Sequence, residues 1–244
     1  DIQRKTVSPI VAPENLAKLE GLIRSRTQAA LDALPINQPF DWVSSVSINL
    51  TTQMLATLFD FPWEDRAKLT RWSDVATAEL DSGLVDSEEA RMAELFECAE
   101  YMMRLWNERV NADPKPDLLS MLAHNEQTRH MSREEFLGNM LLLIVGGNDT
   151  TRNSMTAGVL ALNQFPREYD KLCANPDLIG SMVSEVIRWQ TPLAHMRRTA
   201  LQDTELAGKQ IRKGDKVVMW YTSGNRDASA IDRPDEFIVD RERP

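Results

Sequence analysis

Cysteine is nearly absent from this chain of 244 residues, which contains Cys98 and Cys173 alone. Neither residue belongs to a Cys-x-x-Cys pair or has a histidine at metal-ligand spacing, so the sequence indicates no zinc site and no disulfide scaffold. Two isolated cysteines are typical of a reducing compartment, and we expect a cytoplasmic protein. We interpret each of them as a small buried hydrophobic residue.

Long apolar runs and an excess of positive charge are also missing. The longest run, 140–145, is far shorter than the roughly 18 residues of a membrane-spanning helix. The formal net charge of −9 argues against the basic surface of a nucleic-acid binder and leaves a small-molecule enzyme open. The N-terminus carries no secretory signal pattern. Since the chain starts at Asp1 and stops at Pro244 without a tail, we expect both ends to be internal positions of a longer protein.

Most of the chain, from about residue 13 to residue 195, has the pattern of helices joined by short connectors rich in Pro, Asp and Asn. Apolar residues at helical spacing predict helices over 14–34, over 46–59 and from 86 to about 110. Beyond residue 199 the pattern changes to short alternating segments separated by turn residues, which predict small strands and a hairpin over 203–211. The fold class that follows is mainly α, with a minor antiparallel β portion, in one domain over 1–244 (1–195 mainly helical, 196–244 β hairpins).

The best-marked helix begins at Ser132. Ser132 and Glu135 form a capping box, in which each side chain accepts from the backbone N–H of the other residue. Apolar residues continue to Phe165, where Pro166 stops the helix. About 33 residues at 1.5 Å per residue span roughly 50 Å, so we expect this helix to be the buried axis of the fold.

The middle of that helix contains Gly146-Gly147-Asn148-Asp149-Thr150-Thr151, although each glycine costs about 1 kcal/mol relative to alanine. One explanation is a close contact with another helix, or a kink. A phosphate loop would need a preceding strand and a Gly-Lys-Ser/Thr ending, which are missing. The third explanation is that the glycines let a flat cofactor approach the backbone while Asp149 and Thr150 supply a proton relay. Positions 147, 150 and 151 lie on adjacent parts of one face.

A second motif is Glu185-Val186-Ile187-Arg188. A Glu–Arg pair at this spacing is usually a surface ion pair that contributes a few tenths of a kcal/mol. The apolar neighbours of this pair favour the other interpretation, a buried ion pair that is retained for its geometry.

Taken in order, these motifs resemble the cytochrome P450 family. The segment 146–151 is similar to the family's oxygen-activating motif, and Glu185-x-x-Arg188 to its Glu-x-x-Arg motif. Arg198 resembles the arginine that pairs with a haem propionate, and Arg4 the arginine of a His-x-x-x-Arg propionate clamp whose histidine would precede the chain. The segment 225–241 is similar to the stretch that leads into the haem loop.

The resemblance implies haem b and O2 as cofactors, with electrons from NAD(P)H through a ferredoxin and a ferredoxin reductase. It implies Thr150 as the hydrogen-bonding catalytic group and Asp149 as the relay, with Gly146 and Gly147 at the cofactor. Glu185 and Arg188 would be structural. The family's cysteine loop, Phe-x-x-Gly-x-x-x-Cys-x-Gly, is absent, so we expect the iron ligand beyond Pro244 and an inactive fragment.

The strings around the central motif and around 223–237 look most like the bacterial branch that hydroxylates alkanes. This implies terminal hydroxylation of medium-chain alkanes or fatty acids. A P450 acting on a terpenoid or steroid, and a non-catalytic helical protein that binds apolar ligands, remain alternatives. Residues that would contact an apolar substrate, or else fill the core, are Leu142, Val145, Leu193, Ala194 and Met196.

Overall fold

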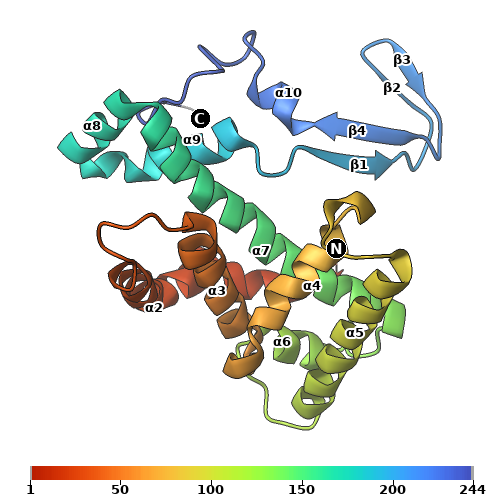
Figure 1. Cartoon of the computed structure of the whole chain (residues 1–244). Coiled ribbons are helices and arrows are strands. Elements are labelled where there is room, and N and C mark those ends of the chain that lie inside the picture. Colours follow the sequence, from red (N-terminus) through yellow and green to blue (C-terminus); the bar gives the residue numbers. More distant parts are fainter. Residues whose placement is uncertain (1, 243–244) are drawn as a thin grey trace. The chain divides into compact units, whose positions relative to one another are not determined.

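The computed structural model describes residues 2–242 (Figure 1). The chain forms two compact units, one ending at Arg152 and the other beginning at Asn153, and their boundary falls inside the helix α7. The helices before α7 are α1 (Ile2–Val7), α2 (Pro13–Asp32), α3 (Asn49–Phe59), α4 (Ala67–Thr77), α5 (Glu88–Val110) and α6 (Leu118–His124). The predicted helices over 14–34, 46–59 and 86–110 correspond to α2, α3 and α5. A π-helical turn, Val43–Ile48, runs directly into α3, so helical structure begins three residues earlier than the pattern predicts.

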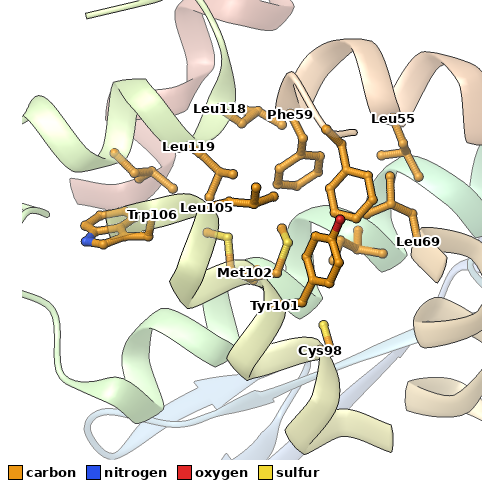
Figure 2. Packing of buried hydrophobic residues seen from close by; sticks show 14 of the residues in the cluster. Leu55, Phe59, Leu69, Cys98, Tyr101, Met102, Leu105, Trp106, Leu118 and Leu119 are labelled. Atoms are coloured by element: carbon orange, nitrogen blue, oxygen red, sulfur yellow. The ribbon is translucent and has the colours of Figure 1, made fainter. Parts of the chain in front are cut away.

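The core of the first unit is an apolar cluster to which α3, α4, α5, α6 and the first part of α7 contribute. Figure 2 shows how labelled side chains of α3, α4, α5 and α6 meet. The ring of Tyr101 stacks on Phe61 with centroids 5.0 Å apart, and its hydroxyl donates to Asp65 at 2.6 Å. Burying a side chain the size of Leu or Phe contributes about 1.5–3 kcal/mol to the free energy of unfolding, so packing against this cluster stabilises the position of α7. Its labelled members are Leu55, Phe59, Leu69, Cys98, Tyr101, Met102, Leu105, Trp106, Leu118 and Leu119.

Helix α7 (Arg133–Gln164) begins as predicted. The backbone N–H of Glu135 donates to the Ser132 hydroxyl at 3.2 Å, and the N–H of Ser132 donates to the Glu135 carboxylate at 3.1 Å. The prediction of a buried axis holds for one face only in the first unit. Met140 and Ile144 are fully buried, whereas Leu142 is 70% exposed. The helix therefore has an inner face on the core and an open face beside it.

The second unit contains α8 (Pro166–Ala174), α9 (Ile179–Gln190), α10 (Tyr221–Asn225) and two small antiparallel sheets. In one sheet β1 (His195–Thr199) pairs with β4 (Lys216–Trp220), and in the other β2 (Thr204–Leu206) pairs with β3 (Lys209–Ile211). The predicted hairpin over 203–211 is confirmed. Its turn residues Ala207 and Gly208 both have positive φ, 50° and 74°, as a tight two-residue hairpin turn requires.

Two sequence predictions are wrong in this unit. Helical structure does not extend to His195, because α9 ends where Thr191 adopts the left-handed conformation with φ 49°, directly before Pro192. The chain is then extended, so β1 starts at His195 and not at the predicted position near Thr199. The second error concerns the cysteines: Cys98 is buried as predicted, but Cys173 is exposed on α8.

Among the residues described, no helix combines the length and the apolar character that crossing a bilayer would require.

Candidate functional site

The open face of α7 carries a hydroxyl beside a glycine. Thr150 Oγ1 donates to the carbonyl oxygen of Gly146 at 3.1 Å. Gly146 is exposed, and a Cβ added to it would meet nothing within 4 Å. Leu142 lies one turn before Gly146, so the three residues at spacing of four occupy one side of the helix. The result is an accessible strip of backbone flanked by an apolar side chain and a hydroxyl.

Gly147 faces the other way. A Cβ added to it would lie 2.6 Å from Cδ2 of Leu55 on α3, and Leu55 is 2% exposed. Next to this contact the Thr51 hydroxyl donates to Asn148 Oδ1 at 3.1 Å, with both side chains buried. The close-contact explanation therefore describes Gly147, and Gly146 is the glycine that shares a face with Thr150. A cofactor role for Gly147 stays a prediction.

Asp149 is half-buried and engaged in an ion pair. Arg152 Nη2 donates to Asp149 Oδ1 at 2.6 Å, and Nη1 of the same guanidinium donates to Asp74 Oδ1 on α4 at 2.9 Å. Burial raises the pKa of Asp149, the Arg152 charge lowers it, and the charge of Asp74 raises it, with a net rise. A carboxyl group with a raised pKa exchanges protons closer to neutral pH than an ordinary aspartate does. Sequence reasoning missed Arg152, although its position three residues after Asp149 is a spacing that pairs charges on a helix.

Arg4 and Leu142, predicted separately as a propionate ligand and a substrate contact, line the same hollow of about 280 Å³. Other walls are the apolar side chains of Leu122 and Leu143 and the amide of Asn139. Arg4 is exposed on α1, and Val145 is half-buried on α7. A guanidinium beside apolar side chains suits a ligand with a carboxylate attached to an apolar body.

The predicted pair in the second unit is buried. Glu185 is 0% and Arg188 4% exposed, so the surface interpretation is excluded. Arg188 donates from Nε to Glu185 Oε2 at 2.7 Å and from Nη2 to Oε1 at 2.8 Å. The N–H of Ile238 donates to Oε1 at 2.9 Å, and Arg241 Nε donates to Oε2 at 3.0 Å.

Together these donors determine the charge on Glu185. Burial alone would raise the pKa of Glu185, but the hydrogen bonds from Arg188, Ile238 and Arg241 outweigh it and lower the pKa. The Arg188 guanidinium also donates to the carbonyl groups of Asn225, Pro234 and Glu236, at 2.8, 2.7 and 2.9 Å. The network therefore fixes the irregular segment 225–241. The direct bond from Arg241 to Glu185 was not predicted, because 56 residues separate them and no local pattern connects the two.

The remaining predicted residues lie on or next to β1. Arg198 is exposed opposite Val217 of β4, and its Nη1 donates to the carbonyl of Arg197 at 3.1 Å. Met196 is half-buried and Leu193 is 43% exposed. The exposed Ala194 accepts a hydrogen bond from the N–H of Thr222 through its carbonyl. The predicted site residues thus form two groups: Arg4, Leu142, Val145, Gly146, Gly147, Asp149 and Thr150 before Arg152, and Glu185, Arg188, Leu193, Ala194, Met196 and Arg198 after it.

Comparisons with known proteins agree with the motif pattern. Linalool 8-monooxygenase of Pseudomonas putida is 36% identical over 239 residues, covering 98% of this chain and 59% of that protein. The structure of cytochrome P450-153 from Novosphingobium aromaticivorans matches with a TM-score of 0.87 and 47% identity, covering 98% of this chain and 58% of that one. CYP153D17 from Sphingomonas sp. PAMC 26605 matches with a TM-score of 0.88 and 52% identity, covering 98% and 60%.

The chain spans less than two thirds of the length of each of these relatives. The family model described as cytochrome P450 matches residues 52–241, which is more than half of the chain. It takes in the central motif of α7, the Glu185–Arg188 pair and Arg241. The chain therefore belongs to the cytochrome P450 family.

Proposed function

We propose that the full-length protein is a haem-thiolate monooxygenase that hydroxylates the terminal carbon of medium-chain alkanes or fatty acids. The observation that carries the proposal is the open face of α7, where Gly146 leaves the backbone accessible next to the Thr150 hydroxyl. The two solved relatives from the 153 group, at 47% and 52% identity, support the branch that the sequence motifs indicate.

The residues present fit a haem in part. The open backbone at Gly146 suits a flat group, and the exposed guanidinium groups of Arg4 and Arg198 suit its propionates. Neither cysteine suits the iron. Burial raises the pKa of Cys98 to about 12, which keeps it a thiol, and Cys173 is exposed on α8. When bound, the haem would supply the oxygen-activating chemistry, with electrons from NAD(P)H through a ferredoxin and its reductase.

Residues of the chain itself would transfer protons to the reacting centre. The Thr150 hydroxyl donates to the Gly146 carbonyl, and a hydroxyl group can both donate and accept hydrogen bonds. Burial raises the pKa of Asp149, the adjacent residue, so this carboxylate takes up a proton from solvent more readily than an ordinary aspartate does. We therefore assign proton uptake to the Asp149 carboxylate and hydrogen bonding at the reacting centre to Thr150 Oγ1.

The substrate assignment depends on the apolar residues of both groups. Leu142 is 70% exposed on the face that carries Gly146 and Thr150, and an alkyl chain would cover it. Val145, Leu193, Ala194 and Met196 are proposed as further contacts. A terpenoid is the second candidate, because the relative with 36% identity is a linalool 8-monooxygenase. Turnover of n-octane against linalool by the full-length protein discriminates between the two.

Thr150→Val tests the proton assignment, with Thr151→Val as the matched control on the neighbouring, exposed threonine. We expect Thr150→Val to divert electrons from product to hydrogen peroxide, with a loss of coupling of at least about tenfold, because a positioned proton donor contributes about 10²–10⁴ in rate. The Thr151→Val variant should stay coupled. Equal coupling in both variants would remove Thr150 from the mechanism.

The absorption spectrum of the reduced, carbon-monoxide-bound protein tests the cofactor. A red-shifted Soret band of the thiolate type is expected. A protein that takes up no haem would favour a helical protein that binds apolar ligands without redox chemistry.

A further inference from the structure

The side chain of Arg152 connects two acidic residues from different helices. Its Nη2 donates to Asp149 on α7 at 2.6 Å, and its Nη1 donates to Asp74 on α4 at 2.9 Å. All three side chains are mostly buried: Arg152 is 17%, Asp149 23% and Asp74 25% exposed. At this degree of burial solvent screens the charges less than at an open surface, so each of them affects the others.

The arrangement leaves Asp149 with opposing influences. The guanidinium favours its ionised form, while burial and the like charge of Asp74 favour its protonated form. The Thr77 side chain of α4 adds a hydrogen bond that favours the ionised form. Because one guanidinium serves two carboxylates, anything that moves Asp74 changes how strongly Arg152 holds Asp149. Asp74 belongs to α4, so the protonation of Asp149 depends on a second helix.

We propose that Arg152 and Asp74 are positioning residues for the proton relay. Arg152 favours the ionised form of the Asp149 carboxylate and orients it by a hydrogen bond within α7. Asp74 on α4 accepts a second hydrogen bond from the same guanidinium and so weakens its effect on Asp149. This inference rests on the proposed role of Asp149 as the relay. Its consequence is that the two residues act on Asp149 in opposite directions: Arg152 makes it a weaker base and Asp74 makes it a stronger one.

Two variants of the full-length, haem-loaded protein test the opposition. Arg152→Gln removes the cation, so the titration midpoint of Asp149 should move to higher pH. Asp74→Asn removes the competing charge, so the midpoint should move to lower pH. The readout is the ¹³C signal of the Asp149 carboxyl carbon in the diamagnetic carbon-monoxide-bound protein, assigned by its disappearance in Asp149→Asn.

Coupling of electron use to product provides the second readout. The acid limb of its pH profile should move in the same direction as the midpoint in each variant. At a fixed pH on that limb, peroxide release should rise at least about twofold in Arg152→Gln and fall in Asp74→Asn. Arg152→Lys keeps the charge without the planar fork and should restore the midpoint in part. If Arg152→Gln fails to fold, Asp74→Asn and Arg152→Lys still test the direction of the shifts.

Lys68→Gln is the matched control. Lys68 also lies on α4 and pairs with Glu97 of α5 at 2.5 Å, so the variant loosens α4 without removing a charge from the Asp149 cluster. Its midpoint should be unchanged. The inference would be overturned if the Asp149 midpoint were unchanged in Arg152→Gln and Asp74→Asn, or if it shifted in the same direction in both. Either result would not affect the proposed role of Asp149 as the relay. Full coupling in Asp149→Asn would overturn the relay itself and this inference with it.

Discussion

The two compact units are stabilised in different ways. The first has a broad apolar cluster from five helices, including fully buried Phe59, Leu119 and Ile144. The second has a small apolar cluster around Phe237 and a buried carboxylate, Glu185, that receives four hydrogen bonds. Apolar packing tolerates changes of similar volume, whereas a buried charge requires every partner in place. Long irregular segments can thus be ordered in the second unit without a large core.

Glu185→Ala should produce the largest effect. It leaves the Arg188 guanidinium buried without its carboxylate, and breaking such a pair costs about 3–5 kcal/mol. Because the described partners of Glu185 lie at 188–241, amide hydrogen exchange should speed up mainly in 225–241. Phe59→Ala is the counterpart in the first unit, with a similar cost of about 3–5 kcal/mol but loss of protection in 49–124.

Glu185→Gln is the control for shape, since it keeps the volume and one acceptor oxygen. Its loss of protection should be smaller than that of Glu185→Ala. Unchanged exchange across 225–241 in Glu185→Ala would mean that the apolar cluster around Phe237 is sufficient for this unit.

Gly147→Ala should have an intermediate effect and belongs to the packing of the first unit. The new methyl group would collide with Leu55 on α3, and overpacking of this kind costs about 1–3 kcal/mol, against a helix-propensity gain of up to about 1 kcal/mol. Gly146→Ala is the matched variant: with open space at its Cβ, it should stabilise α7 by up to about 1 kcal/mol through helix propensity. Urea unfolding of both variants measures the difference. A Leu55→Ala change added to Gly147→Ala should remove the collision, and equal destabilisation of both glycine variants would contradict it.

The smallest effect is the pH dependence of the free energy of unfolding, which changes by at most about 1.4 kcal/mol per pH unit for each proton. The folded-state pKa of Glu185 lies below its ordinary value of 4.5, so its contribution to stability is present above pH 4.5 and is lost as the pH falls. Burial raises the pKa of Asp117 in the first unit above its ordinary value of 3.8, so its ionisation lowers stability as the pH rises from 3.8.

Segment-resolved hydrogen exchange between pH 6 and pH 3.5 would detect these opposite signs. Acid should weaken protection in 225–241. Around α6, where Asp117 is the N-terminal cap, it should strengthen protection, because the buried carboxylate loses its charge. Glu185→Gln and Asp117→Asn should each flatten the response of their own unit. A response of the same sign in both units would contradict the assignment.

Local patterns predicted the parts of the structure that local forces decide. The capping box at Ser132 and Glu135, the α5 helix and the hairpin turn at Ala207 and Gly208 depend on neighbours within a few residues. Each of these was predicted from the sequence. The end of α9 was not, because the left-handed Thr191 is held by tertiary contacts such as the bond from Asn225 to its hydroxyl.

The candidate site shows the same limit. The motif in the middle of α7 predicted Asp149 and Thr150 as a relay, and the spacing of three residues on α9 predicted Glu185 and Arg188 as a pair. Which glycine faces the core depended on Leu55, 92 residues earlier in the sequence. The contact between Arg152 and Asp74 spans 78 residues. Such pairings follow from the packing of helices, and a single sequence carries no direct signal for them.

The bonds to Glu185 also have a consequence for synthesis of the chain. Glu185 is translated 53 residues before Ile238 and 56 residues before Arg241. At about 5–20 residues per second, roughly 3–11 s pass between the synthesis of Glu185 and the synthesis of the N–H and the guanidinium that complete its surroundings. Until they leave the ribosome, the second unit lacks the partners that allow the charge to be buried. The described apolar cluster of the first unit needs no residue beyond Ile144, so it can form before the bonds to Glu185 are complete.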